Sequence, residues 1–181
     1  MMRLLQLLTA LAAVLAQRDI QRDEEIEAFH NSIRNDDLET ATELLHHAGV
    51  RTATLHEQTS LHLAATNGHA RMITLLLEEA DAEVDHVDKD KWSPLMYASF
   101  NGHTEAVRTL IAAGASVDLK NEYGMTALKL AAGRNHQDIV KLLVAGGADK
   151  AAKDMYGHTA HHYAKQNKHL ETAELLAHDE L

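Results

Sequence analysis

The chain has 181 residues, a size typical of one domain with a substantial core. Hydrophobic residues make up 45% of the chain and charged residues 24%, as in globular proteins rather than disordered or membrane-embedded ones. The low aromatic content (4%) and the single proline argue against an all-β protein. A formal charge of −10 disfavours nucleic-acid binding. The lack of cysteine in the sequence excludes disulfides, thiol catalysis, cysteine-type zinc sites and iron–sulfur clusters.

The first residues differ in composition from the rest of the chain. Arg3 supplies a positive charge, and residues 4–16 (LLQLLTALAAVLA) are apolar except for two polar side chains. Small residues precede Gln17, where the chain turns abruptly polar. This layout is typical of a secretory signal peptide, and the apolar run is too short to span a bilayer. We therefore predict a cleaved signal peptide at 1–16 and a linker at 17–23, with an amphipathic capping helix at 1–16 as the alternative.

A repeated pattern occupies most of the remaining sequence. Four segments align at intervals of 34, 33 and 33 residues: TSLHLAA from Thr59, SPLMYAS from Ser93, TALKLAA from Thr126 and TAHHYAK from Thr159. Each segment is followed by a histidine at a fixed offset and then by apolar residues. These offset histidines are His69, His103, His136 and His169.

The segments resemble the ankyrin repeat, whose T-P-L-H-x-A-A core and helix–turn–helix period they match. The resemblance implies an all-α solenoid of helix–turn–helix units with short β-hairpin turns and atypical capping repeats at both ends. Residues 24–53 lead to Leu44-Leu45 without a hairpin signature, as an N-terminal capping repeat does. The expected units are the capping repeat at 24–53, ankyrin repeats at 54–87, 88–120 and 121–153, and a C-terminal capping repeat at 154–177.

The chemistry of individual residues supports the same helices. Four hydroxyl residues are predicted to cap the first helix of each repeat, because their side chains can accept hydrogen bonds from the exposed backbone N–H groups of the first turn. They are Thr59, Ser93, Thr126 and Thr159. Pro94 falls at a first helical position, where its missing N–H is harmless. Gly68, Gly102 and Asn135 predict left-handed residues where these helices end. Lys168 takes the same place in the last repeat, at a greater conformational cost.

The chain is rich in histidine, with fourteen in all, yet we predict no metal site and no cofactor. The resemblance gives structural roles to the four offset histidines and to His62 and His162 of the repeat motif. The spacing of His158, His161 and His162 would allow a surface transition-metal site. That alternative has no cysteine and no obviously convergent carboxylates to support it.

Catalytic signatures do not emerge from the sequence. The serines fall at caps and helix positions that the repeat explains, and no nucleophile elbow, glycine-rich phosphate loop or EF-hand spacing occurs in the sequence. We therefore predict a protein that is not an enzyme.

In ankyrin-like proteins the hairpin tips and the exposed side of each first helix form a concave binding surface. Carried across by position, the resemblance assigns this surface to Leu55, His56, Gln58, Lys89, Asp90, Trp92, Tyr97, Glu122, Tyr123, Met125, Leu130, Met155, Tyr156, His158 and Tyr163, with Phe100 close by.

Exposed aromatic and methionine side chains dominate the energetics of many protein interfaces. Trp92, Tyr123 and Tyr156, expected on hairpin tips, are therefore the strongest candidates for partner contact. Tyr97 and Tyr163 could instead pack between adjacent repeats.

The sequence ends in HDEL, formed by His178, Asp179, Glu180 and Leu181. A terminal HDEL is the address read by the retrieval receptor of the endoplasmic reticulum. With the predicted signal peptide, it predicts residence in the lumen of that organelle and the retrieval receptor as one partner. The alternatives are the cytoplasm, or the periplasm of a bacterial source.

Taken with the resemblance, these features predict a monomeric, non-enzymatic adaptor that binds another protein through its concave face, without binding nucleic acid or inserting into a membrane. From the net charge we expect a partner with a neutral or basic surface. Two alternatives stay open. One is a luminal metal- or calcium-buffering protein using surface histidines and acids, and the other is a cytosolic ankyrin adaptor with 1–16 as a capping helix.

Overall fold

A computed structural model of the chain describes residues 21, 23–48, 54–55, 58–80 and 82–177. The predicted signal peptide at 1–16, most of the linker, His56 and the HDEL sequence lie outside the described residues.

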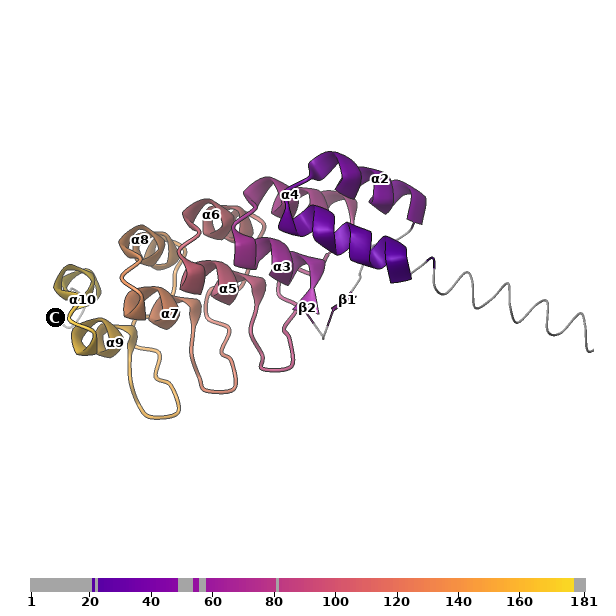
Figure 1. The fold of residues 1–181 in the computed structure, drawn as a ribbon. Coiled ribbons are helices and arrows are strands. Elements are labelled where there is room, and N and C mark those ends of the chain that lie inside the picture. The colour runs from indigo at the N-terminus through magenta and orange to yellow at the C-terminus, as the bar shows by residue number, and fades with distance from the viewer. Residues whose placement is uncertain (1–20, 22, 49–53, 56–57, 81, 178–181) are drawn as a thin grey trace, which may run out of the picture.

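The helices form two layers along one axis (Figure 1). The first helix of each repeat lies in the inner layer, which consists of α3 (Ser60–Asn67), α5 (Pro94–Asn101), α7 (Ala127–Gly133) and α9 (Ala160–Gln166). The second helices form the outer layer, α4 (Ala70–Glu79), α6 (Thr104–Ala112), α8 (Gln137–Ala145) and α10 (Leu170–Ala177). Successive inner helices pack side by side, so the predicted all-α repeat solenoid is confirmed.

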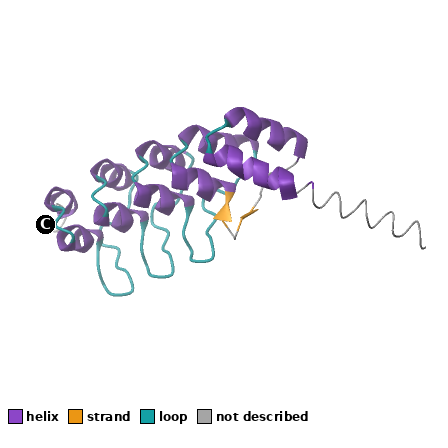
Figure 2. Cartoon of the chain, viewed as in Figure 1, coloured by secondary structure: helices purple, strands orange, loops and turns teal. Residues whose placement is uncertain are grey.

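Long turns project from the inner layer between repeats (Figure 2). In the first of them β1 (Thr54–Leu55) pairs antiparallel with β2 (Gln58–Thr59). The predicted capping repeat at 24–53 contains a helix over residues 23–34 followed by α2 (Leu38–Ala48), which packs against α4. None of the helices among the described residues combines the length and the apolar character needed to cross a bilayer.

The core lies between the two layers and runs the length of the stack. Leucines at equivalent positions of the two layers are buried, as are the small alanines between neighbouring inner helices: Leu61, Leu95, Leu128, Leu76, Leu110, Leu143, Leu176, Ala64, Ala98, Ala131 and Ala164. A buried leucine contributes about 1.5–3 kcal/mol. His161 takes the inner leucine position in the last repeat and is half-buried, as suits the end of a stack.

Helix boundaries follow the predicted caps. Thr59, Ser93, Thr126 and Thr159 each accept a hydrogen bond from the backbone N–H three residues later. Left-handed backbone occurs where predicted, with φ of 79° at Gly68, 83° at Gly102, 64° at Asn135 and 63° at Lys168.

Three of the four offset histidines join successive repeats, in keeping with the structural role that the resemblance implied. The ring of His103 donates from Nε2 to the Thr66 carbonyl (2.9 Å), and His136 donates to the Phe100 carbonyl (3.1 Å). His69 makes the same bond to the Arg34 carbonyl of the capping repeat (3.1 Å). Each bond satisfies a carbonyl near the end of an inner helix and fixes the next repeat against it.

Glycine gives these histidine rings their space. A Cβ at Gly68 would lie 2.5 Å from Nδ1 of His103, and one at Gly102 would lie 2.6 Å from Cε1 of His136. Both positions therefore require glycine for two reasons: the backbone is left-handed, and a side chain would occupy the space of the neighbouring histidine ring. Asn135 takes the equivalent left-handed position in the next repeat, where its Oδ1 accepts a hydrogen bond from Thr172 Oγ1 (2.6 Å).

Replacing Gly68 by Ala tests this double requirement. Gly68→Ala should lower the free energy of unfolding by about 1–2 kcal/mol for the left-handed backbone and by about 1–3 kcal/mol more for the clash with His103. Urea denaturation of Gly114→Ala provides the control, since Gly114 has φ of 87° but open space around its Cβ position. Equal losses in the two variants would contradict the role given to the histidine ring.

Candidate binding surface

A buried Asp or Asn shapes each of the three complete turns. One side-chain oxygen of Asp88, Asn121 and Asp154 accepts hydrogen bonds from the backbone N–H groups two and four residues further on, at 2.8–3.0 Å. The three side chains are 5–8% exposed. These bonds curl each turn back toward the inner helix that follows it.

Tyrosine hydroxyls complete two of these turns. Tyr97 donates to the second carboxylate oxygen of Asp88 (2.6 Å), and Tyr163 donates in the same way to Asp154. The turn that begins with Asn121 has Leu130 at the tyrosine position. Carboxylates occur where a hydroxyl donor is present and the amide occurs where it is not, because an ionised carboxylate only accepts hydrogen bonds.

The hydrogen bonds decide how these groups ionise. Burial raises the pKa of Asp88, but the bonds from Tyr97 and from the backbone N–H groups outweigh it and hold the pKa below its ordinary value. Asp154 has the same balance, and its pKa is also lowered. Burial and then the bond to Asp154 raise the pKa of Tyr163 to about 12.

Hydrogen bonds between turns bring their tips together. The Glu122 N–H donates to the Asp90 carbonyl (3.4 Å), and the Met155 N–H donates to the Tyr123 carbonyl (3.2 Å). Tyr123, Met155 and Tyr156 are 56%, 62% and 69% exposed and lie on these two adjoining tips. We call these three residues the tip patch. They are among the most exposed large hydrophobic side chains of the described residues.

Trp92 lies elsewhere than expected. Its ring is half-buried against Tyr97 and Phe100, with ring centroids 5.0 and 5.6 Å apart, instead of being exposed on a tip. The His62 ring, itself buried, donates from Nε2 to the Trp92 carbonyl (3.0 Å) and holds this part of the turn against α3. Tyr97 is likewise tied to Asp88, so both residues support the surface as well as line it.

Arg134 joins this aromatic group from the next repeat. Its guanidinium carbon lies 4.0 Å from the centroid of the Phe100 ring, in a cation–π contact. Sequence reasoning missed Arg134, although its place just after α7 corresponds to Asn101 and Asn167 on the neighbouring inner helices.

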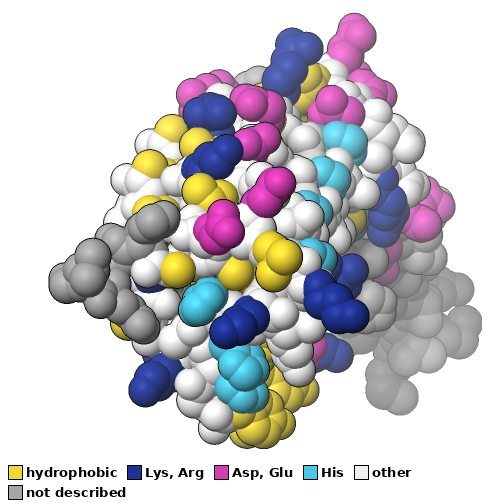
Figure 3. Space-filling view, turned by 90° about the vertical axis from the view of Figure 1, so that its left-hand side faces the viewer, with side chains coloured by type: hydrophobic (Ala, Val, Ile, Leu, Met, Phe, Trp, Pro, Cys, Tyr) yellow, Lys and Arg dark blue, Asp and Glu magenta, His cyan; other side chains and the backbone are white. Residues whose placement is uncertain are grey.

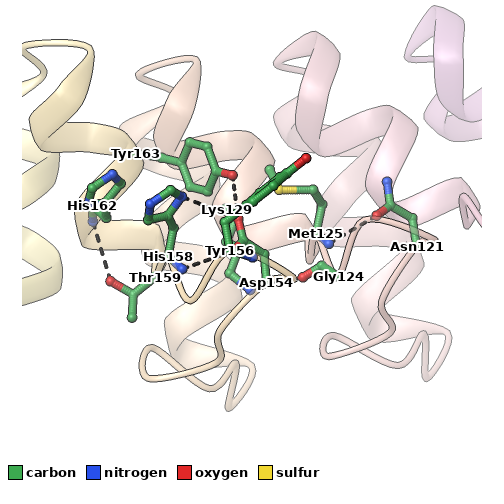
Figure 4. Close-up of polar contacts among 10 residues, drawn as sticks. All are labelled: Asn121, Gly124, Met125, Lys129, Asp154, Tyr156, His158, Thr159, His162 and Tyr163. Atoms are coloured by element: carbon green, nitrogen blue, oxygen red, sulfur yellow. Dashed lines mark hydrogen bonds and ion pairs between the residues drawn. The ribbon is translucent and has the colours of Figure 1, made fainter.

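A second ring group lies at the C-terminal end of the surface (Figure 4). His158 and His162 stack with centroids 3.9 Å apart and planes 3° from parallel, and Tyr163 meets both edge-on. The motif histidine His62 forms a capping box with Thr59, whereas the ring of His162 contacts His158. The two differ because the turn carbonyl that His62 binds has no counterpart beyond α9 among the described residues.

Lys129 fills the motif-histidine position in α7 and is buried. Its Nζ donates to the Gly124 carbonyl (3.0 Å), across the turn that precedes its helix. Burial lowers the pKa of Lys129, while the nearby Asp154 carboxylate opposes that effect. The lysine therefore supports the turn from inside, a role that the sequence pattern did not predict.

The remaining predicted surface residues are distributed along the same side. Lys89, Asp90 and Glu122 are exposed, Met125 is half-buried and Leu130 is buried. Leu55 and Gln58 belong to β1 and β2, and His56 lies outside the described residues. Within the described part of the chain, no three His, Cys, Asp or Glu side chains converge in a way that could hold a metal ion.

Tyr97→Phe tests the hydroxyl–carboxylate bond. Removing the hydroxyl leaves a buried charge with one donor fewer, so the free energy of unfolding should fall by about 1.5–3 kcal/mol at neutral pH. Urea denaturation measures this loss. Tyr123→Phe is the control, since that ring is exposed, and should change stability little.

The loss in Tyr97→Phe should shrink in acid. A carboxyl with a lowered pKa stabilises the fold above its unfolded-state pKa, and this contribution disappears as the pH falls through the folded-state pKa. A loss independent of pH would show that the effect of the Tyr97 hydroxyl does not depend on the ionised carboxylate of Asp88.

Comparison with known proteins agrees with this architecture. A family model described as ankyrin repeats (3 copies) matches residues 29–121 and 113–181. The chain is 30% identical over 113 residues to protein phosphatase 1 regulatory subunit 27 of Homo sapiens, covering 61% of this chain and 72% of that protein.

Other relatives are much longer than this chain. It is 41% identical over 68 residues to probable E3 ubiquitin-protein ligase XBOS31 of Oryza sativa subsp. japonica, covering 37% of this chain and 15% of that protein. Cortactin-binding protein 2 of Ornithorhynchus anatinus is 42% identical over 60 residues, covering 33% of this chain and 4% of that protein. The aligned regions thus span only a small part of these two relatives.

Proposed function

The chain belongs to the ankyrin-repeat family, and we propose that it is a non-enzymatic adaptor that binds a partner protein through its turn tips and inner helices. The observation that carries this proposal is the tip patch. Tyr123, Met155 and Tyr156 expose most of their surface on adjoining turns, and side chains of these types supply much of the binding energy at protein interfaces.

The rigidity of the surface supports a binding role. The tips are joined through backbone hydrogen bonds, and each turn is held by a buried Asp or Asn. Little ordering is therefore needed when a partner binds, and little of the contact energy is lost to it.

The relative from Homo sapiens favours a role without catalysis. Its name describes a regulatory subunit of a phosphatase, that is, a protein that acts on an enzyme. By analogy this chain would act by occupying a surface of its partner. One repeat architecture of this kind serves many ligands.

Replacing the tip patch tests the proposal. The triple variant Tyr123→Ala, Met155→Ala, Tyr156→Ala should lose at least about 2 kcal/mol of binding energy, because it removes three exposed anchors at once. Partners captured by the wild-type chain would be identified by mass spectrometry and their affinities measured by titration. Helical circular dichroism should stay unchanged, since the three side chains lie outside the core.

Leu170→Ala is the matched control for this experiment. Leu170 is 68% exposed but lies on α10 in the outer layer. Partners retained equally by the triple variant and by the control would place the interface outside the tips and overturn the proposal.

Residence in the endoplasmic reticulum is a separate part of the proposal. It rests on residues 1–16 as a signal peptide and 178–181 as a retrieval signal. A chain tagged after Gln17 should stay in that organelle, and its variant lacking 178–181 should appear in the medium. A cytosolic location of both chains would overturn this part and favour the cytosolic alternative.

A further inference from the structure

Charge is distributed unequally between the two layers. The inner helices α3, α5, α7 and α9 contain no Asp or Glu. The outer helices carry the acids Glu78, Glu79, Glu105, Asp138, Glu171 and Glu174. In Figure 3 the acidic side chains gather over the upper part of the molecule, and His, Lys and Arg predominate below.

Two of the three basic side chains on the outer helices form ion pairs, and Arg71 forms none with the residues that the structure describes. On the outer helices Arg108 pairs with Glu105 (3.6 Å) and Lys141 pairs with Asp138 (3.6 Å). On the turn side Lys89, Lys91 and Arg134 make no ion pair with any residue that the structure describes.

Most acids of the turns are already engaged by the fold. Asp85 accepts the Ser116 N–H (2.9 Å), and Asp118 accepts the Asp149 N–H (2.9 Å). Asp88 and Asp154 are buried and bound by backbone N–H groups and tyrosine hydroxyls. Glu83, Asp90 and Glu122 are exposed acids of the turns. Lys89 and Lys91 flank Asp90, and Lys120 lies two residues before Glu122.

Arg134 is the best-placed cation of this surface. One face of its guanidinium lies over Phe100, and the group makes no hydrogen bond with a described residue. Stacking by one face leaves the in-plane N–H groups available, and these fit a carboxylate in a bidentate manner. The stack also restricts the side chain before any partner arrives, which lowers the entropy lost on binding.

We infer that the partner segment is an acidic peptide that carries an apolar or aromatic side chain. This inference deepens the proposed function and rests on it. The apolar side chain packs on the tip patch, and carboxylates bind Arg134 and the turn lysines. This partner is opposite in charge to the neutral or basic one expected from the net charge, because it contacts the inner helices, which carry no Asp or Glu, and Arg134 just after α7.

Synthetic peptides provide the probe for this inference. One peptide alternates Glu with Leu and ends in Tyr, and two others have every Glu replaced by Gln or by Lys. Trp92 is the single tryptophan of the chain and packs against Phe100, so its fluorescence reports binding beside Arg134. We expect the Glu peptide to bind, to bind more weakly as salt is raised, and to exceed both other peptides.

Arg134→Gln should weaken binding of the Glu peptide by about tenfold, a loss typical of one interface arginine. The affinity of Arg134→Lys for the Glu peptide should lie between those of the wild type and Arg134→Gln, because lysine keeps the charge and loses the planar guanidinium. Arg108→Gln is the matched control, an exposed arginine of the outer layer, and should bind as the wild type does. Circular dichroism of each variant confirms that the helices are intact.

Three outcomes would overturn the inference. The Gln or Lys peptide could bind as well as the Glu peptide, or the Arg134→Gln variant could bind the Glu peptide unchanged. Sedimentation could instead show self-association that Arg134→Gln abolishes, which would make the acidic outer layer of a second copy the occupant. None of these three outcomes changes the result of the triple tip-patch variant, which tests the proposed function. Failure of the proposed function would appear separately, as partners that the triple variant captures as well as the wild type does.

Discussion

One type of hydrogen bond, from a histidine ring to a carbonyl at the end of the preceding helix, sets how three of the repeats meet the unit before them. His69, His103 and His136 all make it, and at Gly68 and Gly102 the backbone leaves room for the ring that follows. The bond fixes the spacing of the inner helices and therefore the spacing of the turns. The adjoining tips, the stacked rings and the placement of Arg134 over Phe100 all depend on that spacing.

The turns have their own internal support, which works on a smaller scale. A buried carboxylate or amide curls each of the three complete turns. In two of them a tyrosine hydroxyl of the following helix binds the carboxylate, and in the third Lys129 binds a backbone carbonyl of the turn. Side chains that line the surface, such as Tyr97 and Tyr163, are thereby also part of its framework. The tip residues Tyr123, Met155 and Tyr156 have no comparable burial and are the part of the surface left to a partner.

Much of the architecture could be predicted from the sequence because the determinants are local. The period, the hydroxyl caps and the left-handed residues at Gly68, Gly102 and Asn135 each depend on a few neighbouring residues. The surface was harder to predict. Trp92 is half-buried because rings nine or fewer residues away fold back onto it, and Arg134 stacks on a ring of a different repeat.

Net charge and the distribution of charge carry different information. A sum over the sequence carries no information on which layer holds which sign, and only the alternation of inner and outer helices separates the two. The absence of Asp and Glu from the inner helices can be recognised from the repeat pattern, because the charges of each predicted helix can be counted separately.

The acids of the outer helices and the acid-free inner helices with Arg134 give the two helix layers an electric dipole across the thin dimension of the molecule. A dipole of this kind acts before contact, over distances up to the Debye length of about 8 Å at physiological ionic strength. It turns an approaching negative segment toward the inner helices and repels it from the outer helices.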